Sequence, residues 1–151
     1  MSLPALDGAV TLPDGTRVRG RSLRQWPATG PTPSRGLYLG TITTQRKYGP
    51  AMPWQQDWVR WRDFGLPRDR SDAVAAIVRL HAAMRAGDQV ECACWGGRGR
   101  TGTVLACLVV MAGCSACEAV DFVRTHYAAK AVETRAQRRW VERFAGEIGR
   151  H

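Results

Sequence analysis

The sequence predicts an α/β domain whose central, mostly parallel sheet is flanked by helices. Short β-prone runs alternate with helix-like segments along the 151 residues, which is typical of this class. One segment, "QVECACWGGRGRTG" at 89–102, passes from an apolar strand through a glycine-rich turn into a helix, as expected for a phosphate loop. A chain of this length is expected to form one compact domain spanning residues 1–151.

Strands dominate the first part of the chain. Residues 9–21 predict a hairpin, because a Pro-Asp-Gly turn separates two β-prone flanks. The runs "GLYLG" at 36–40 and "WVRW" at 58–61 are also typical of strands. Between them, residues 41–57 contain two prolines and are expected to form a long surface loop.

Helices are expected to dominate the second part. The first begins near Ser71, which can cap it, and a strand at 89–93 then leads into the glycine-rich turn. The apolar run at 101–113 predicts a buried helix. Capping boxes, S-x-x-E at 115–118 and T-x-x-Q at 134–137, open two further helices.

Composition narrows the possible partners. The net charge is +9, from 22 basic and 13 acidic residues, but the arginines are scattered along the whole chain, which favours an anionic substrate over nucleic acid. The longest apolar run, at 104–114, is too short for a membrane span, and the N-terminus lacks the features of a signal peptide. We therefore expect a cytoplasmic protein whose five cysteines are thiols. The pairs Cys92-x-Cys94 and Cys114-x-x-Cys117 could supply four zinc ligands, but the helix-like segment between them would hold the pairs apart, so we expect no metal or other cofactor.

Three kinds of phosphate site fit a glycine-rich turn such as 93–103. A nucleotide-binding P-loop requires a lysine, and this stretch has none. A dinucleotide fingerprint, G-x-G-x-x-G, is present at 97–102, but it requires an acidic residue at a strand end about twenty positions later. Glu118 and Asp121 stand near that distance and fall on a predicted helix, which argues against this interpretation.

The third interpretation is a catalytic cysteine in an anion-binding loop. Inward-pointing backbone N–H groups at a helix N-terminus can hold a phosphate, and Arg100 can grip two of its oxygens. The same positive field favours the thiolate form of Cys94, the nucleophile, and Thr101 can donate a hydrogen bond to that sulfur. The phosphate-binding residues are expected to be Trp95, Gly96, Gly97, Arg98, Gly99 and Arg100.

The stretch "CWGGRGRTG" at 94–102 resembles the C-x5-R-S/T signature of the protein tyrosine phosphatase superfamily, in a compact, dual-specificity-like and bacterial-type form. The family also carries an aspartate general acid on an upstream loop, and the resemblance assigns that role to Asp63 in "WRDFGLP". It further assigns to Gln137, in "VETRAQRRW", the positioning of the hydrolytic water. The resemblance spans residues 58–144.

The chain departs from the family pattern at two positions. Ala93 replaces the histidine that often precedes the cysteine, which removes one contribution to thiolate stabilisation, and Arg62 replaces the usual proline of the acid loop. Asp69 and Asp72 are rival acids, although Asp72 is expected to begin a helix, and Glu91 is expected to be packed or paired on its strand.

The resemblance implies a phosphatase that forms a cysteinyl-phosphate intermediate. The implied partner is a phosphorylated protein, with phosphotyrosine as the substrate and Tyr48 either beside its ring or solvated on a loop. Arg98 adds charge to the loop, and basic loops also suit phosphoinositides or RNA 5′-phosphates. A module that binds phosphorylated partners without turnover is the non-catalytic alternative.

Overall fold

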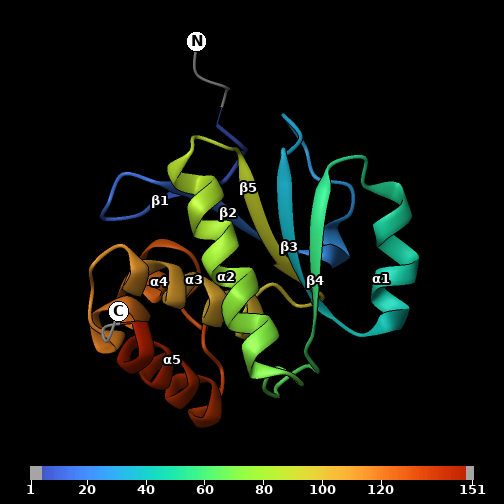
Figure 1. Cartoon of the computed structure of the whole chain (residues 1–151). Coiled ribbons are helices and arrows are strands. Elements are labelled where there is room, and N and C mark those ends of the chain that lie inside the picture. Colours follow the sequence, from blue (N-terminus) through green and yellow to red (C-terminus); the bar gives the residue numbers. More distant parts are fainter. Residues whose placement is uncertain (1–4, 149–151) are drawn as a thin grey trace.

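A five-stranded sheet organises the computed structural model, which describes residues 5–148 (Figure 1). The strand order is β1-β2-β5-β3-β4, and the strands are β1 (Val10–Thr11), β2 (Arg17–Ser22), β3 (Arg35–Gly40), β4 (Gln55–Arg60) and β5 (Val90–Cys94). Strands β2, β5, β3 and β4 run parallel, and only β1 pairs antiparallel, with β2. The predicted mostly parallel sheet and the predicted N-terminal hairpin are therefore confirmed.

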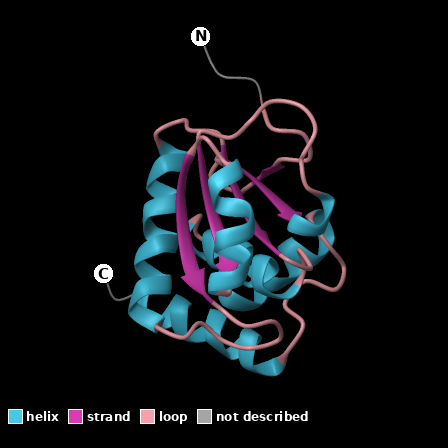
Figure 2. Cartoon of the chain, turned by 90° about the vertical axis from the view of Figure 1, so that its right-hand side faces the viewer, coloured by secondary structure: helices cyan, strands magenta, loops and turns pink. Residues whose placement is uncertain are grey.

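Helices cover both faces of this sheet (Figure 2). Four helices pack on one face, namely α2 (Arg70–Arg85), α3 (Gly99–Met111), α4 (Ala116–His126) and α5 (Arg135–Ile148). The other face is covered by helix α1 (Ile42–Tyr48) and by two short 3-10 turns, η1 (Leu23–Gln25) and η2 (Gly49–Ala51). Among residues 5–148, no helix is long and apolar enough to cross a membrane.

The prediction of a long loop over residues 41–57 was wrong. This segment forms helix α1, turn η2 and the first part of β4. The Thr41 side chain accepts a hydrogen bond from the Thr44 N–H and so begins the helix, and Tyr48 at its end is buried. The predicted cap of α2 was also wrong, because the Asp69 carboxylate accepts the Asp72 N–H at 3.1 Å and the helix begins at Arg70.

A buried charge network lies on the face of the sheet that α1 covers. Glu91 of β5 is fully buried and accepts hydrogen bonds from Arg19 Nη2 at 2.5 Å and Arg21 Nε at 3.0 Å. The Tyr38 hydroxyl donates to the other carboxylate oxygen at 2.6 Å and accepts from Trp54 Nε1 at 2.7 Å. Burial, with the Glu91 charge beside it, raises the pKa of the Tyr38 phenol, so this hydroxyl stays a donor. Glu91 is paired, as predicted.

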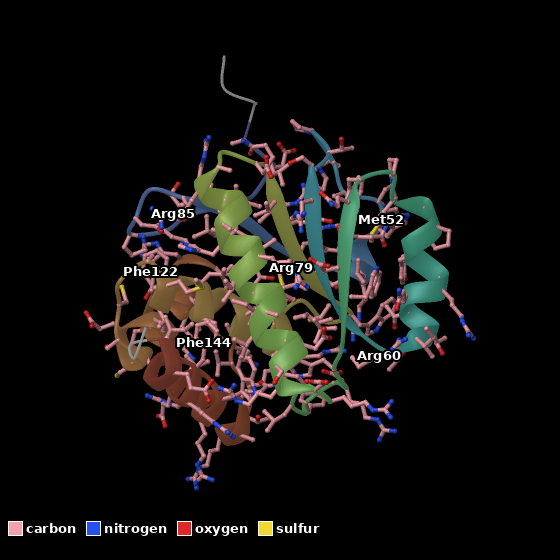
Figure 3. All side chains as sticks on the ribbon, in the orientation of Figure 1. Met52, Arg60, Arg79, Arg85, Phe122 and Phe144 are labelled. Atoms are coloured by element: carbon pink, nitrogen blue, oxygen red, sulfur yellow. The ribbon has the colours of Figure 1, made fainter. Side chains whose placement is uncertain are left out.

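The capping boxes at 115–118 and 134–137 are both present. Ser115 and Glu118 exchange reciprocal hydrogen bonds at the start of α4. Thr134 and Gln137 do the same before α5, since the Gln137 N–H donates to Thr134 Oγ1 and the Thr134 N–H donates to Gln137 Oε1. The apolar face of α5 packs against α3 and α4, and its Phe144 is buried in the core (Figure 3).

Candidate active site

The glycine-rich turn lies at the carboxyl end of the central strand, where ligands of parallel sheets bind. Strand β5 ends at Cys94, helix α3 begins at Gly99, and residues 95–98 connect them. Gly97 has a φ of +73°, a region that suits glycine, and its N–H donates to Cys94 Sγ at 3.1 Å. The turn therefore directs one backbone amide at the buried sulfur and places the start of a helix beside it.

Two distant residues hold this turn in shape. The Ser22 hydroxyl, at the end of β2, donates to the Trp95 carbonyl at 2.5 Å. The Tyr127 hydroxyl, just after α4, donates to the Gly97 carbonyl. Neither residue was predicted to belong to the site, because neither lies near the motif in sequence. For Ser22, only the strand register of the structure reveals the link to the site, because it pairs Ser22 with Cys94.

Arg100, in the first turn of α3, is buried and held in a fixed position. Its Nη1 donates to the carbonyls of Leu39 at 3.4 Å and Trp61 at 2.9 Å, and its Nη2 lies 3.6 Å from the Asp63 carboxylate. Its Nε has no hydrogen-bond partner among residues 5–148. A buried cationic donor that lacks a partner is costly unless an anion completes it, so this geometry fits a bound oxyanion.

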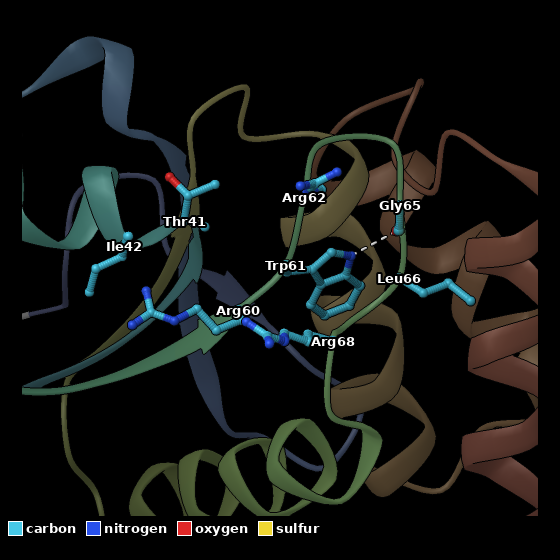
Figure 4. Close-up of a pocket in the computed structure, with 9 residues that line it drawn as sticks. Thr41, Ile42, Arg60, Trp61, Arg62, Gly65, Leu66 and Arg68 are labelled. Carbon is cyan, nitrogen blue, oxygen red and sulfur yellow. Dashed lines mark hydrogen bonds between the residues drawn. The ribbon is translucent and has the colours of Figure 1, made fainter.

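Asp63 stands on a short loop, residues 61–67, that closes on itself; we call it the acid loop. Trp61 pairs with Pro67 across its base, and Trp61 Nε1 donates to the Gly65 carbonyl at 2.8 Å (Figure 4). At its tip, Phe64 has a φ of +61° and donates its N–H to Asp63 Oδ1 at 3.0 Å. The Asp63 side chain is 49% exposed, so one edge faces Arg100 and the rest faces solvent.

Gln137 ties the start of α5 to the acid loop. Its side chain is fully buried, and Oε1 accepts the N–H groups of Glu133 at 3.0 Å and Thr134 at 3.3 Å. Its Nε2 donates to the Gly65 carbonyl at 3.3 Å. The acid loop therefore links two of the predicted residues to Asp63, since Arg100 contacts Trp61 and Asp63 while Gln137 contacts Gly65. Cys94 lies at the other end of the turn that leads to Arg100.

Comparison with known families decides what this arrangement is. The model of a family described as "PTP-SAK: Swiss Army Knife protein, DSP-PTPase phosphatase domain" matches residues 42–145. The chain belongs to this family. This confirms the resemblance seen in the sequence, and it argues against the dinucleotide-binding interpretation of residues 97–102.

The curated relatives include two proteins of Methanocaldococcus jannaschii, each described as an uncharacterized protein. MJECL20 is 35% identical over 89 residues, which cover 58% of this chain and 57% of that protein. MJ0215 is 35% identical over 86 residues, which cover 56% of this chain and 51% of that protein. The alignments thus span only about half the length of either relative.

Solved structures show that this DSP-PTPase domain shares its fold with other phosphatases. Tk-PTP in its active form superposes with a TM-score of 0.67 at 21% identity, covering 93% of this chain and 98% of Tk-PTP. Human DUSP28 also gives 0.67, at 16% identity, covering 94% of this chain and 98% of DUSP28. At these identities the similarity concerns the fold.

Aromatic side chains gather around Trp95 in the glycine-rich turn of this DSP-PTPase domain. Trp95 is 38% exposed, its ring lies 6.2 Å from that of Tyr48, and the guanidinium of Arg24 lies 5.7 Å from its centroid. Tyr48 is buried under Trp95 and Trp26, so the expectation of a solvated loop residue was wrong. Arg98, the last residue of the turn, is exposed.

Several other predicted residues lie apart from this group. The Thr101 hydroxyl is buried and has no hydrogen-bond partner within residues 5–148, so its predicted bond to the Cys94 sulfur is absent. Asp69 is engaged as the cap of α2. His81 of α2 is buried and shares a hydrogen bond of 2.9 Å with Asp14, so it lies outside the candidate site.

Proposed function

We propose that this DSP-PTPase domain hydrolyses phosphate monoesters through a cysteinyl-phosphate intermediate on Cys94, and that its substrate is phosphotyrosine in proteins. The observation that carries the proposal is the buried Arg100 guanidinium. Two backbone carbonyls fix it in place, and its Nε lacks a partner among residues 5–148. The glycine-rich turn at 95–98 connects Arg100 to Cys94, whose sulfur already accepts the Gly97 N–H. Together these groups match the charge and the oxygens of a phosphate.

In the first step the Cys94 thiolate attacks phosphorus. An S–P bond forms as the P–O bond to the leaving group breaks, and Asp63 gives its proton to the departing oxygen. Arg100 and the amides of the turn stabilise the charge on the remaining phosphoryl oxygens. The position of Asp63, 3.6 Å from Arg100, supports this role because the leaving oxygen would lie between the cysteine and the acid loop.

In the second step water attacks the cysteinyl-phosphate. Asp63 accepts a proton from the water as the new P–O bond forms and the S–P bond breaks. Inorganic phosphate is released and the Cys94 thiolate is regenerated. Gln137 has one amide N–H left after its bond to Gly65, and we propose that this group holds the water. We propose that the Thr101 hydroxyl, which has no hydrogen-bond partner among residues 5–148, donates to the departing sulfur.

The exposed ring of Trp95 supports phosphotyrosine as the substrate. The Trp95 ring, which is 38% exposed and packs on the buried Tyr48, offers an aromatic surface next to the turn on which a phenyl ring can pack. A phosphoinositide is the second candidate, because PTPMT1 in complex with PI(5)P superposes with a TM-score of 0.59 at 18% identity, covering 77% of this chain and 79% of PTPMT1. RNA 5′-phosphates and phosphate binding without turnover are the remaining alternatives.

The test is hydrolysis of para-nitrophenyl phosphate in the presence of a chelator. We expect Cys94→Ser to abolish turnover and Asp63→Ala to lower kcat by about 10²- to 10⁴-fold. Cys117→Ser and Asp121→Ala, at exposed positions of α4, are the matched controls and should keep wild-type activity. Turnover that survives Cys94→Ser, or that the chelator removes, would overturn the mechanism.

The substrate class requires a second comparison. We expect kcat/KM to be highest for a phosphotyrosine peptide when it is measured beside a phosphoserine peptide, soluble dioctanoyl PI(5)P and a 5′-phosphorylated RNA. If the lipid or the RNA were the better substrate, phosphotyrosine specificity would be wrong and the cysteine mechanism would stand. Binding of the phosphopeptide without any turnover would indicate the non-catalytic alternative.

A further inference from the structure

A pocket of about 890 Å³ lies beside the acid loop (Figure 4). One wall is formed by Thr41 and Ile42, where β3 passes into α1, and the opposite wall by Gly65 and Leu66 of the acid loop. The indole of Trp61 lies between the two walls. The volume of the pocket is typical of sites that bind small molecules, so the pocket can hold a group larger than a single ion.

Three arginines line this pocket, and no carboxylate of the described chain does. They are Arg60, Arg62 and Arg68, and within residues 5–148 none of them forms an ion pair. The nearest acids in sequence are engaged elsewhere, because Asp63 faces Arg100 and Asp69 caps α2. The pocket therefore has an uncompensated positive charge and suits an anionic group.

The pocket borders the candidate catalytic group at Trp61. The Trp61 carbonyl accepts the hydrogen bond from Arg100 Nη1 at 2.9 Å, while the Trp61 ring lines the pocket. The Arg68 N–H donates to the Arg60 carbonyl at 2.9 Å, which brings the two arginines to the same side of the pocket. The arginines and Arg100 thus stand on either side of Trp61, so the pocket is next to the position where a phosphate would bind.

We propose that this pocket binds an acidic side chain of the substrate polypeptide, close in sequence to its phosphorylated residue. The inference rests on the proposed phosphatase function of Cys94 and extends it to substrate selection. A polypeptide is favoured over nucleic acid because the one aromatic ring lining the pocket among residues 5–148, that of Trp61, is 2% exposed and offers no open face for a base to stack on. An extended peptide advances about 3.3 Å per residue, so an acidic residue within a few positions can enter the pocket.

The experiment compares phosphotyrosine peptides that carry glutamates at one, two or three positions on either side with the matched alanine peptides. The readout is the ratio of kcat/KM for the glutamate peptide to that for the alanine peptide, so the fraction of folded enzyme cancels. The proteins are the wild type, the double variant Arg60→Gln/Arg68→Gln and the control Arg85→Gln. Arg85 is exposed in the last turn of α2, far from Arg60 (Figure 3).

We expect the wild type and Arg85→Gln to prefer at least one glutamate peptide by about fivefold or more, as two partly exposed ion pairs would give. In the double variant the ratio should fall below about twofold, and in the wild type it should decrease with salt. A wild-type ratio below fivefold, or one that survives the double substitution, would overturn the proposal while leaving the cysteine mechanism intact.

If the wild type turns over no substrate, the proposed function fails and the pocket is tested by binding alone. The ratio of Kd values for the same peptide pairs, measured by fluorescence anisotropy with Cys94→Ser in each background, then decides by the same thresholds. Arginine-dependent sedimentation with phosphatidylserine vesicles, without any preference among peptides, would also overturn the proposal, since a membrane would then be the partner.

Discussion

The glycine at position 97 provides a sharp test of the phosphate loop. Its φ of +73° is strained for an alanine, and an added Cβ would lie 2.8 Å from the Ser22 nitrogen and 2.9 Å from the Ser22 Cα. These neighbours are backbone atoms of a sheet strand, so they cannot move aside without disturbing β2. A Cβ added at Gly96, the preceding residue, would meet no atom within 4 Å, and the φ of Gly96 lies outside the left-handed region. Gly96 is therefore the matched control.

Two costs add up for Gly97→Ala. The left-handed conformation costs roughly 1–2 kcal/mol for a residue with a Cβ. The steric overlap costs about 1–3 kcal/mol more, as for other overpacked sites. We therefore expect a loss of about 2–5 kcal/mol in the free energy of unfolding, whereas Gly96→Ala should stay within about 1 kcal/mol of the wild type.

Urea unfolding followed by tryptophan fluorescence measures both variants. The midpoint of Gly97→Ala should fall at an unchanged m value, because the loss lies in the native state. Its phosphatase activity should fall as well, since the Gly97 N–H would no longer meet Cys94 Sγ. A difference below about 1 kcal/mol between the two variants would refute the left-handed conformation of Gly97 and its close approach to β2.

Three further predictions concern buried and capping groups. Glu91→Gln leaves two buried arginines without their counter-charge, so we expect it to cost about 3–5 kcal/mol in urea unfolding; a loss under about 1 kcal/mol would contradict this. Hydrogen bonds from the Ser115 side chain and backbone lower the pKa of Glu118, so its stabilising effect is present above about pH 4.5 and lost as the pH falls through the lowered value. Glu118→Gln should therefore flatten the acid side of the stability profile, and an unchanged profile would argue against the capping box. Burial raises the pKa of the Cys107 thiol, so iodoacetamide at about pH 8 should modify the exposed Cys117 and spare Cys107, as mass spectrometry would show; equal labelling would be the contrary result.

The sequence predicted those elements whose apolar residues recur at a regular spacing. The parallel strands and the buried helix α3 stand out as apolar segments, whereas α4 and α5 were predicted from the polar capping boxes at their starts. Helix α1 was missed because only Tyr48 among its residues is buried, so the segment has no helical periodicity to detect. The start of α2 was misplaced because Asp69 and Ser71 are both good capping residues, and only the backbone geometry distinguishes them.

The site was predictable to the extent that its residues belong to a motif. The motifs assigned Asp63 and Arg100 to the same site, and the structure places them 3.6 Å apart. Ser22 and Tyr127 could not be predicted, because they contact the turn through hydroxyl-to-carbonyl bonds that leave no pattern in the sequence. The three arginines that line the pocket could not be predicted either, because basic residues are scattered along the whole sequence and no motif marks these three.

The pairing of β2 with β5 has a consequence for any shortened form of the protein. Strand β5, which ends at Cys94, the proposed nucleophile, lies between β2 and β3, and Ser22 stands opposite Cys94. A fragment cut at the limits of the family match, residues 42–145, would lose both neighbours of β5. The strand would then expose unpaired N–H and C=O groups on two sides, which invites association with other chains. The residues that carry the motif are therefore a smaller set than the residues needed to pair both edges of the strand that leads into it.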